Sequence, residues 1–105
     1  MTTAVHMTEA QFTDTVVELA KWHRWQVAHF RPARTTRGWR TTMQGHIGFP
    51  DLVLARAGVV LLVELKTIHG KLGRGQQEWA DQIGAAYRLW RPTDLEEIKR
   101  ELRYG

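Results

Sequence analysis

Apolar side chains recur at helical spacing near the start of the chain. They form one stripe along residues 9–23: Phe12, Val16, Leu19 and His23. That period is typical of an amphipathic helix with one face in a core. Thr8 precedes the stripe, and Gln11 stands three residues after Thr8. This spacing is that of a capping box, which satisfies the first free N–H groups of a helix. The pattern therefore predicts a helix from about Glu9 to His23.

Four other segments have the apolar alternation or continuous apolar character of strands: residues 25–30, 49–55, 59–67 and 86–90. Ala57-Gly58 separates the second segment from the third, and a turn this tight predicts an antiparallel hairpin. The third segment is almost entirely apolar, which is expected of a central strand covered on both faces.

Two shorter helices complete the pattern. One covers residues 76–83 and stops at Gly84; the other follows Pro92, with Thr93 as its predicted cap. The order helix, strand, hairpin, helix, strand, helix predicts an α/β fold with a mixed central sheet flanked by helices. A chain of 105 residues suits one domain, residues 1–105.

Composition narrows the class of protein. The chain has no cysteine, which excludes disulfides and thiol catalysis and suits a cytoplasmic protein. No apolar run is long enough to span a membrane, so no membrane partner is expected. The net charge is +4 and the isoelectric point is about 10.0. A balance this basic indicates an anionic partner, most often nucleic acid.

Much of the positive charge lies in a long predicted loop and in the residues just before it. No acidic residue occurs between Leu19 and Pro50, and residues 31–47 show no period, as in a long functional loop. The candidate DNA contacts are Arg31, Arg34, Arg37, Trp39 and Arg40, with Lys71 and Arg74 in a later glycine-rich turn. Trp39 either stacks on a base or packs onto the core. A solvated basic loop is the alternative interpretation of these arginines.

Three charged residues stand on segments that otherwise predict buried strands: Asp51, Glu64 and Lys66. Residues two apart in a strand share a face, so Glu64 and Lys66 point the same way. In the predicted hairpin Asp51 falls roughly opposite them, close enough for two carboxylates to share one ion. Hard oxygen ligands favour Mg²⁺ or Mn²⁺, and the carbonyl of Leu65 is a further candidate ligand. An ordinary ion pair between Glu64 and Lys66 is the alternative.

Two neighbouring side chains have open roles. Lys66 either orients or deprotonates an attacking water, or it stabilises charge that builds on a phosphate. Gln76 opens the helix after the glycine-rich turn, where it either bonds a water or phosphate or caps the helix.

The combination resembles a known family, the virus-type replication-repair nuclease (VRR-NUC) domain of the PD-(D/E)xK superfamily. The similar residues, in order, are Gly48-Phe49-Pro50-Asp51-Leu52, Glu64-Leu65-Lys66-Thr67, Gly70-Lys71-Leu72, Gln76 and Trp79. The resemblance extends from about Thr8 to Leu102. It implies a restriction-endonuclease-like fold and a Mg²⁺-dependent DNA endonuclease in which Mn²⁺ substitutes. It also implies a homodimer of phage or prophage origin that acts on branched DNA such as four-way junctions.

The resemblance assigns roles to individual residues. Asp51 and Glu64 would ligate the metal, Lys66 would be the catalytic lysine, and Gln76 would be the polar residue of the following helix. Superfamily members often direct a glutamate from the first helix into the site, and Glu9 is the candidate here, with Glu18 as the alternative. The turn before Gln76 departs from the family pattern because it contains two glycines. Two other functions stay open: a non-catalytic nucleic-acid-binding module, and a nuclease subunit of a larger replication or repair complex.

Overall fold

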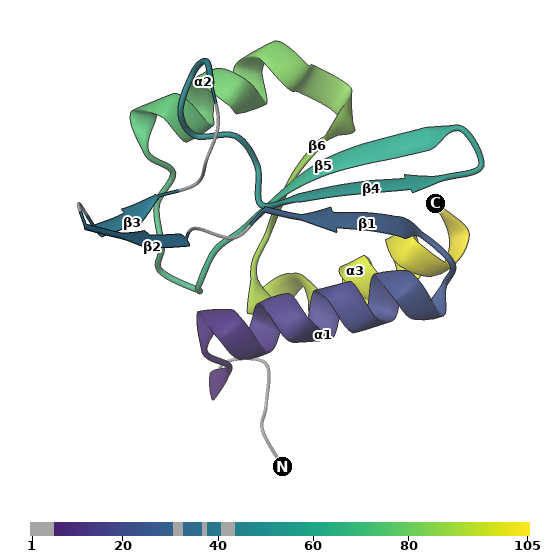
Figure 1. Cartoon of the computed structure of the whole chain (residues 1–105). Helices are drawn as coiled ribbons and strands as arrows, with labels where there is room; N and C mark the ends of the chain where they lie inside the picture. The colour runs from purple at the N-terminus through teal and green to yellow at the C-terminus, as the bar shows by residue number, and fades with distance from the viewer. Residues whose placement is uncertain (1–5, 31–32, 37, 41–43) are drawn as a thin grey trace.

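The computed structural model describes residues 6–30, 33–36, 38–40 and 44–105 (Figure 1). These residues form a mixed α/β fold with a four-stranded mixed sheet and three α-helices. The elements in chain order are α1 (Glu9–Trp22), β1 (Gln26–His29), β2 (Ala33–Thr35), β3 (Gly38–Arg40), β4 (Leu52–Arg56), β5 (Val59–Leu65), α2 (Arg74–Ile83), β6 (Tyr87–Trp90) and α3 (Leu95–Tyr104). Short 3₁₀ turns precede β6 and α3, at Gly84–Ala86 and Pro92–Asp94.

The main sheet has the strand order β1-β4-β5-β6. Strand β4 pairs antiparallel with both β1 and β5, whereas β5 pairs parallel with β6. The predicted hairpin is confirmed: Ala57 and Gly58 turn between β4 and β5 with φ values of 50° and 84°. Two consecutive residues with positive φ are what a tight two-residue hairpin loop requires. This turn sets the register that brings the charged residues of β4 and β5 together.

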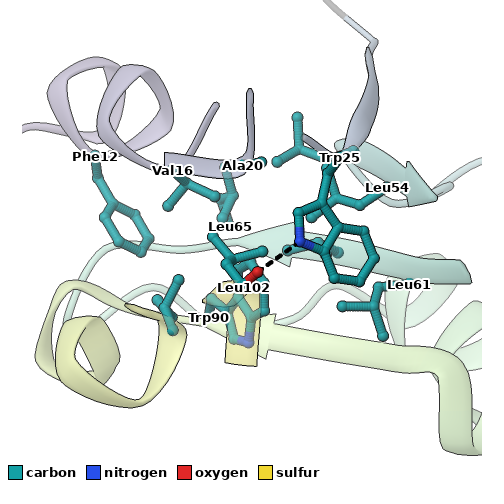
Figure 2. Packing of buried hydrophobic residues seen from close by; sticks show 12 residues of the cluster. Phe12, Val16, Ala20, Trp25, Leu54, Leu61, Leu65, Trp90 and Leu102 are labelled. Carbon is teal, nitrogen blue, oxygen red and sulfur yellow. Dashed lines mark hydrogen bonds between the residues drawn. The ribbon is translucent and has the colours of Figure 1, made fainter. Parts of the chain in front are cut away.

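Helices α1 and α3 lie on one face of the main sheet, and α2 lies on the other (Figure 1). The core fills the space between the sheet and helices α1 and α3 (Figure 2). Its buried side chains are Phe12, Val16, Ala20, Trp25, Leu52, Leu54, Leu61, Val63, Leu65, Trp90, Ile98 and Leu102. The indole N–H of Trp25 is buried there and donates to the carbonyl of Leu102 at 2.8 Å. A buried indole N–H costs free energy unless it finds such a partner.

The capping box at the start of α1 is confirmed: the Thr8 side chain accepts from the Gln11 N–H, and the Gln11 side chain accepts from the Thr8 N–H. Helix α2 begins at Arg74, two residues before the predicted start. The predicted Thr93 cap is wrong, because Pro92–Asp94 forms a 3₁₀ turn and α3 begins only at Leu95. There the carboxylate of Asp94 accepts the N–H of Arg91 at 2.9 Å.

Two other expectations need correction. The loop predicted for residues 31–47 contains an antiparallel pair, β2 with β3, in which Arg34 stands opposite Trp39. These strands have three residues each and no apolar alternation, so hydrophobic periodicity does not reveal them. Strand β5 is interior in the sheet, but its first residues Val59 and Val60 are 40% and 46% exposed. Coverage on both faces therefore does not extend to the hairpin end. Among the described residues, no helix is long and apolar enough to cross a membrane.

Candidate active site

The hairpin places Asp51 beside Glu64. The β4–β5 register pairs Leu52 with Val63, and one further step along both strands brings Asp51 opposite Glu64. Leu52 and Val63 are buried in the core under α1 and α3, so the alternation of a strand turns Asp51 and Glu64 to the face where α2 lies. The carboxylate of Asp51 is fixed there, because its Oδ2 accepts the backbone N–H of Leu65 at 2.9 Å.

Among the described residues, Glu64 is the only charged residue that is buried, with 3% of its surface exposed. One of its carboxylate oxygens, Oε2, accepts the amide N–H of Gln76 at 3.1 Å. The ammonium Nζ of Lys66 lies 3.6 Å from the same oxygen. Lys66 projects from the same face of the strand, as its spacing from Glu64 predicts. The structure thus brings Asp51, Glu64, Lys66 and Gln76 together.

Gln76 caps the helix, which is one of the two roles left open by the sequence, and its bond to a water or phosphate stays a prediction. Its Oε1 accepts the N–H of Gly73 at 2.8 Å and so caps the start of α2, while its amide nitrogen donates to Glu64. The two bonds also fix which end of the amide is oxygen and which is nitrogen. Because the capping bond ties the Gln76 side chain to the turn, the donor to Glu64 is held in place.

A close backbone approach places the first turn of α2 over the strands. Gly48 has a φ of +92°, and a Cβ there would lie 2.5 Å from the backbone nitrogen of Gln76. A Cβ on Gly75 would lie 2.8 Å from the carbonyl oxygen of Ile47. Only glycine permits this contact without a shift of the backbone. The two glycines therefore set the distance between α2 and the segment that leads to Asp51.

The carboxylate pair is electrostatically strained. Burial and, second, the negative charge of Asp51 raise the pKa of Glu64 from 4.5 to about 8, and Lys66 opposes the shift. Burial also raises the pKa of Tyr87 to about 12, and the charges of Glu64 and Asp51 contribute to that rise. Burial and the neighbouring carboxylate therefore disfavour the ionised form of Glu64, and a bound cation would favour it.

Hydrogen bonds from the end of β6 and from Arg91, which follows it, fix the segment after β5. The N–H of Lys66 donates to the carbonyl of Trp90 at 3.0 Å. The guanidinium of Arg91 donates to three carbonyls of the following turn, those of Thr67, Ile68 and Gly70, at 2.6, 3.3 and 2.6 Å. A cation that bonds several carbonyls of one turn restricts it strongly. The Lys66 backbone is therefore anchored on both sides.

The first-helix candidates are not drawn into this cluster. Glu9 is exposed in the first turn of α1, where its charge suits the helix dipole. Glu18 is also exposed. Neither carboxylate has a hydrogen bond or ion pair within the described part of the chain. The role of Glu9 stays a prediction, as does that of the Leu65 carbonyl as a metal ligand.

The candidate DNA contacts are described only in part. Lys71 is exposed, and Arg74 is exposed in an ion pair with Glu78, with 3.2 Å between Nε and Oε1. Arg31 and Arg37 lie outside the described residues. Of the other candidates in the loop, the structure gives the backbone alone: Arg34 in β2, and Trp39 and Arg40 in β3. Their contacts with DNA stay predictions.

Sequence reasoning missed two features beside the site. Tyr87 lies on β6 close enough for the carboxylates to raise its pKa, and only the β5–β6 register shows this. Phe49, between Gly48 and Pro50, contacts Phe30 and Trp79 edge to face at centroid distances of 5.4 and 4.9 Å.

A separate cavity of about 380 Å³ adjoins Trp79, lined by His46, Ile47, Gly75, Glu78, Trp79 and Gln82. The carboxylates do not line it, so the cavity and the charged cluster are distinct.

Within the described residues, no group of three or more His, Cys, Asp or Glu side chains lies close enough to hold a metal ion. Asp51 and Glu64 are a pair, so any cation they share would complete its coordination with backbone carbonyls, water or substrate oxygens, as Mg²⁺ commonly does. No protein-family model matches the chain, and no curated protein matches its sequence.

Proposed function

We propose that this chain is a divalent-metal-dependent DNA endonuclease of the PD-(D/E)xK type, with a restriction-endonuclease-like fold. One observation carries the proposal: Glu64 is buried against Asp51, and Lys66 and Gln76 converge on the same carboxylate. A purely structural ion pair would match one carboxylate with one cation. Here the carboxylate that pairs with Lys66 also has a second carboxylate, Asp51, beside it, at the positions where the VRR-NUC pattern has its metal ligands and catalytic lysine.

The donor set fits Mg²⁺ or Mn²⁺. Asp51 and Glu64 supply hard carboxylate oxygens, and a cation bound to them would favour the ionised form of Glu64, whose pKa is raised first by burial and then by Asp51. Asp51 and Glu64 would hold the cation. When bound, a divalent cation at this place would polarise the phosphoryl group and lower the pKa of a water molecule. Cysteine ligation is excluded because the chain has no cysteine.

The surrounding side chains have separate tasks in phosphodiester hydrolysis. In that reaction a water oxygen bonds to phosphorus, and the bond from phosphorus to one sugar oxygen breaks. The Lys66 ammonium stands beside Glu64, where it can stabilise negative charge on a phosphate oxygen. Gln76 fixes the orientation of Glu64 through its amide. The Leu65 N–H holds one oxygen of Asp51, which fixes the direction of the other.

The partner in this proposal is DNA, in agreement with a net charge of +4 and the run of arginines before the site. Phosphate contacts of that kind supply affinity without sequence preference. Preference for branched DNA and a homodimer that presents two sites to two strands are part of the same proposal. Exposed apolar side chains at the β4–β5 turn, Val59 and Val60, and Tyr104 of α3 support an interface between copies.

The proposal is tested by cleavage of a four-way junction and of a linear duplex with the same arms. The proteins are the wild-type chain and the variants Asp51→Asn and Lys66→Met, each with Mg²⁺ and with EDTA. We expect Mg²⁺-dependent cleavage by the wild type and a fall of roughly 100- to 1,000-fold in either variant, because each removes a charge that acts on the transition state. Lys99→Met, which changes an exposed lysine of α3, is the matched control for lost positive charge.

Wild-type rates in Asp51→Asn or Lys66→Met would rule out the assigned site. Tight, Mg²⁺-independent binding of the junction without cleavage would instead favour the non-catalytic binding module. Sedimentation of the purified chain tests the dimer separately, and a monomer that cleaves at full rate would contradict that part of the proposal.

A further inference from the structure

The hydroxyl of Tyr87 stands out in the described structure. Among the buried side-chain nitrogen and oxygen atoms of the described residues, only this oxygen has no hydrogen-bond partner. A buried donor without a partner costs free energy, so native structures rarely leave one unless it has another use. The position of Tyr87 indicates what that use is.

Tyr87 shares a face and a neighbourhood with the carboxylates. The parallel β5–β6 register pairs Leu62 with Tyr87 and Glu64 with Leu89, so Tyr87 is the diagonal neighbour of Glu64. Paired residues of adjacent strands point to the same face, and diagonal neighbours lie within reach of an aromatic side chain. The charges of Glu64 and Asp51 both act on the Tyr87 hydroxyl and, with burial, raise its pKa to about 12. A tyrosine hydroxyl both donates and accepts hydrogen bonds, whereas an ionised carboxylate beside it can only accept, so the hydroxyl would be the donor.

We propose that Tyr87 is a positioning residue of the metal site: its hydroxyl donates a hydrogen bond to the Glu64–Asp51 carboxylate pair when that pair holds a divalent cation. This inference rests on the proposed function, because it assumes the cation site. Ionised carboxylates only accept hydrogen bonds, and each has about four lone-pair positions. Carboxylates that ligate a metal are usually themselves hydrogen-bonded by neighbouring donors, which orient them.

A purely structural role for the hydroxyl makes a different prediction. If the oxygen served the fold, it would have a partner in the described structure, as the Trp25 N–H does. Replacement by phenylalanine keeps the ring and removes only the unpartnered atom. Such a change leaves the metal-free fold as stable as before or more stable. Loss of metal affinity without loss of stability therefore separates the two roles.

The experiment measures Mn²⁺ binding by calorimetry and thermal unfolding in EDTA, without DNA and without turnover. The proteins are the wild-type chain, Tyr87→Phe and the matched control Tyr104→Phe, whose tyrosine is 72% exposed on α3. We expect Tyr87→Phe to bind Mn²⁺ about 10- to 100-fold more weakly, the usual effect of losing a donor behind a metal ligand. Its melting temperature in EDTA should equal or exceed that of the wild type. Tyr104→Phe should match the wild type in both measurements.

An unchanged Mn²⁺ affinity in Tyr87→Phe would overturn the inference. So would a clear fall in its metal-free melting temperature, because that result would give the hydroxyl a structural partner. Asp51→Asn, measured in parallel, separates this failure from failure of the proposed function. If Asp51→Asn loses Mn²⁺ binding and Tyr87→Phe keeps it, only the role of Tyr87 is wrong. If Asp51→Asn also binds Mn²⁺ like the wild type, the metal site itself is wrong.

Discussion

The metal-free protein should lose stability as the pH rises toward 8, and the cause is Glu64. Its folded pKa is about 8 against an ordinary value of 4.5, mainly because of burial and then because of Asp51. The folded chain therefore binds the Glu64 proton more tightly than the unfolded chain does. The stabilisation from this group is complete below pH 4.5 and is lost as the pH rises through about 8.

The size of the effect follows from the two pKa values. Since a tenfold change in proton affinity is worth about 1.4 kcal/mol, the difference between 4.5 and about 8 corresponds to roughly 5 kcal/mol. Domains of this size have only about 5–15 kcal/mol of total stability, so the loss is a large share of it. A divalent cation that neutralises the pair should restore much of the loss at high pH.

The assay is urea unfolding in EDTA at a series of pH values from 5 to 9, for the wild type and for Glu64→Gln. The variant carries a neutral side chain of the same size, so its free energy of unfolding should fall less steeply with pH. Glu97→Gln, which removes an exposed carboxylate from α3, should retain the wild-type slope. Parallel slopes for the wild type and Glu64→Gln would contradict this expectation, because they would show that Glu64 ionises in the folded chain as easily as in the unfolded chain.

Two further substitutions test how the site is held. Gly48→Ala should abolish cleavage and destabilise the fold, because its Cβ would lie 2.5 Å from the Gln76 backbone nitrogen. The control Gly45→Ala has a φ of +115° and open space around it, so it should cost only the backbone strain of about 1–2 kcal/mol. Urea unfolding and the junction assay measure both, and equal losses in the two variants would contradict the close approach. Arg91→Ala should cost about 1.5–3 kcal/mol and speed amide hydrogen exchange in residues 67–70, because three carbonyls there lose a charged donor. Unchanged exchange in that turn would show that Arg91 does not restrain it.

Much of the charged cluster could be predicted from the sequence because its geometry is local. Glu64 and Lys66 share a face through strand alternation alone. The Ala57-Gly58 turn fixes the hairpin register, and the register in turn sets Asp51 opposite Glu64. Each step depends on residues close in the chain, so no knowledge of distant packing is needed.

The remaining parts depend on contacts between distant segments. Tyr87 reaches the site through the parallel pairing of β5 with β6, whose register is set by how α2 crosses between them. The glycine contact between residues 48 and 75 is likewise invisible until α2 is placed. Helix α2 itself begins earlier than its composition suggests, because Gln76 caps the Gly73 N–H and compensates for poor helix formers at its start.

Diffraction from crystals of the wild-type chain grown with Mn²⁺ would show whether Asp51 and Glu64 share a metal ion. The anomalous signal of manganese locates the ion independently of the protein atoms. We expect a peak between the carboxylates of Asp51 and Glu64, on the side of the sheet where Gln76 and Lys66 lie. A well-ordered site without any anomalous peak there, or manganese bound only elsewhere on the chain, would contradict it.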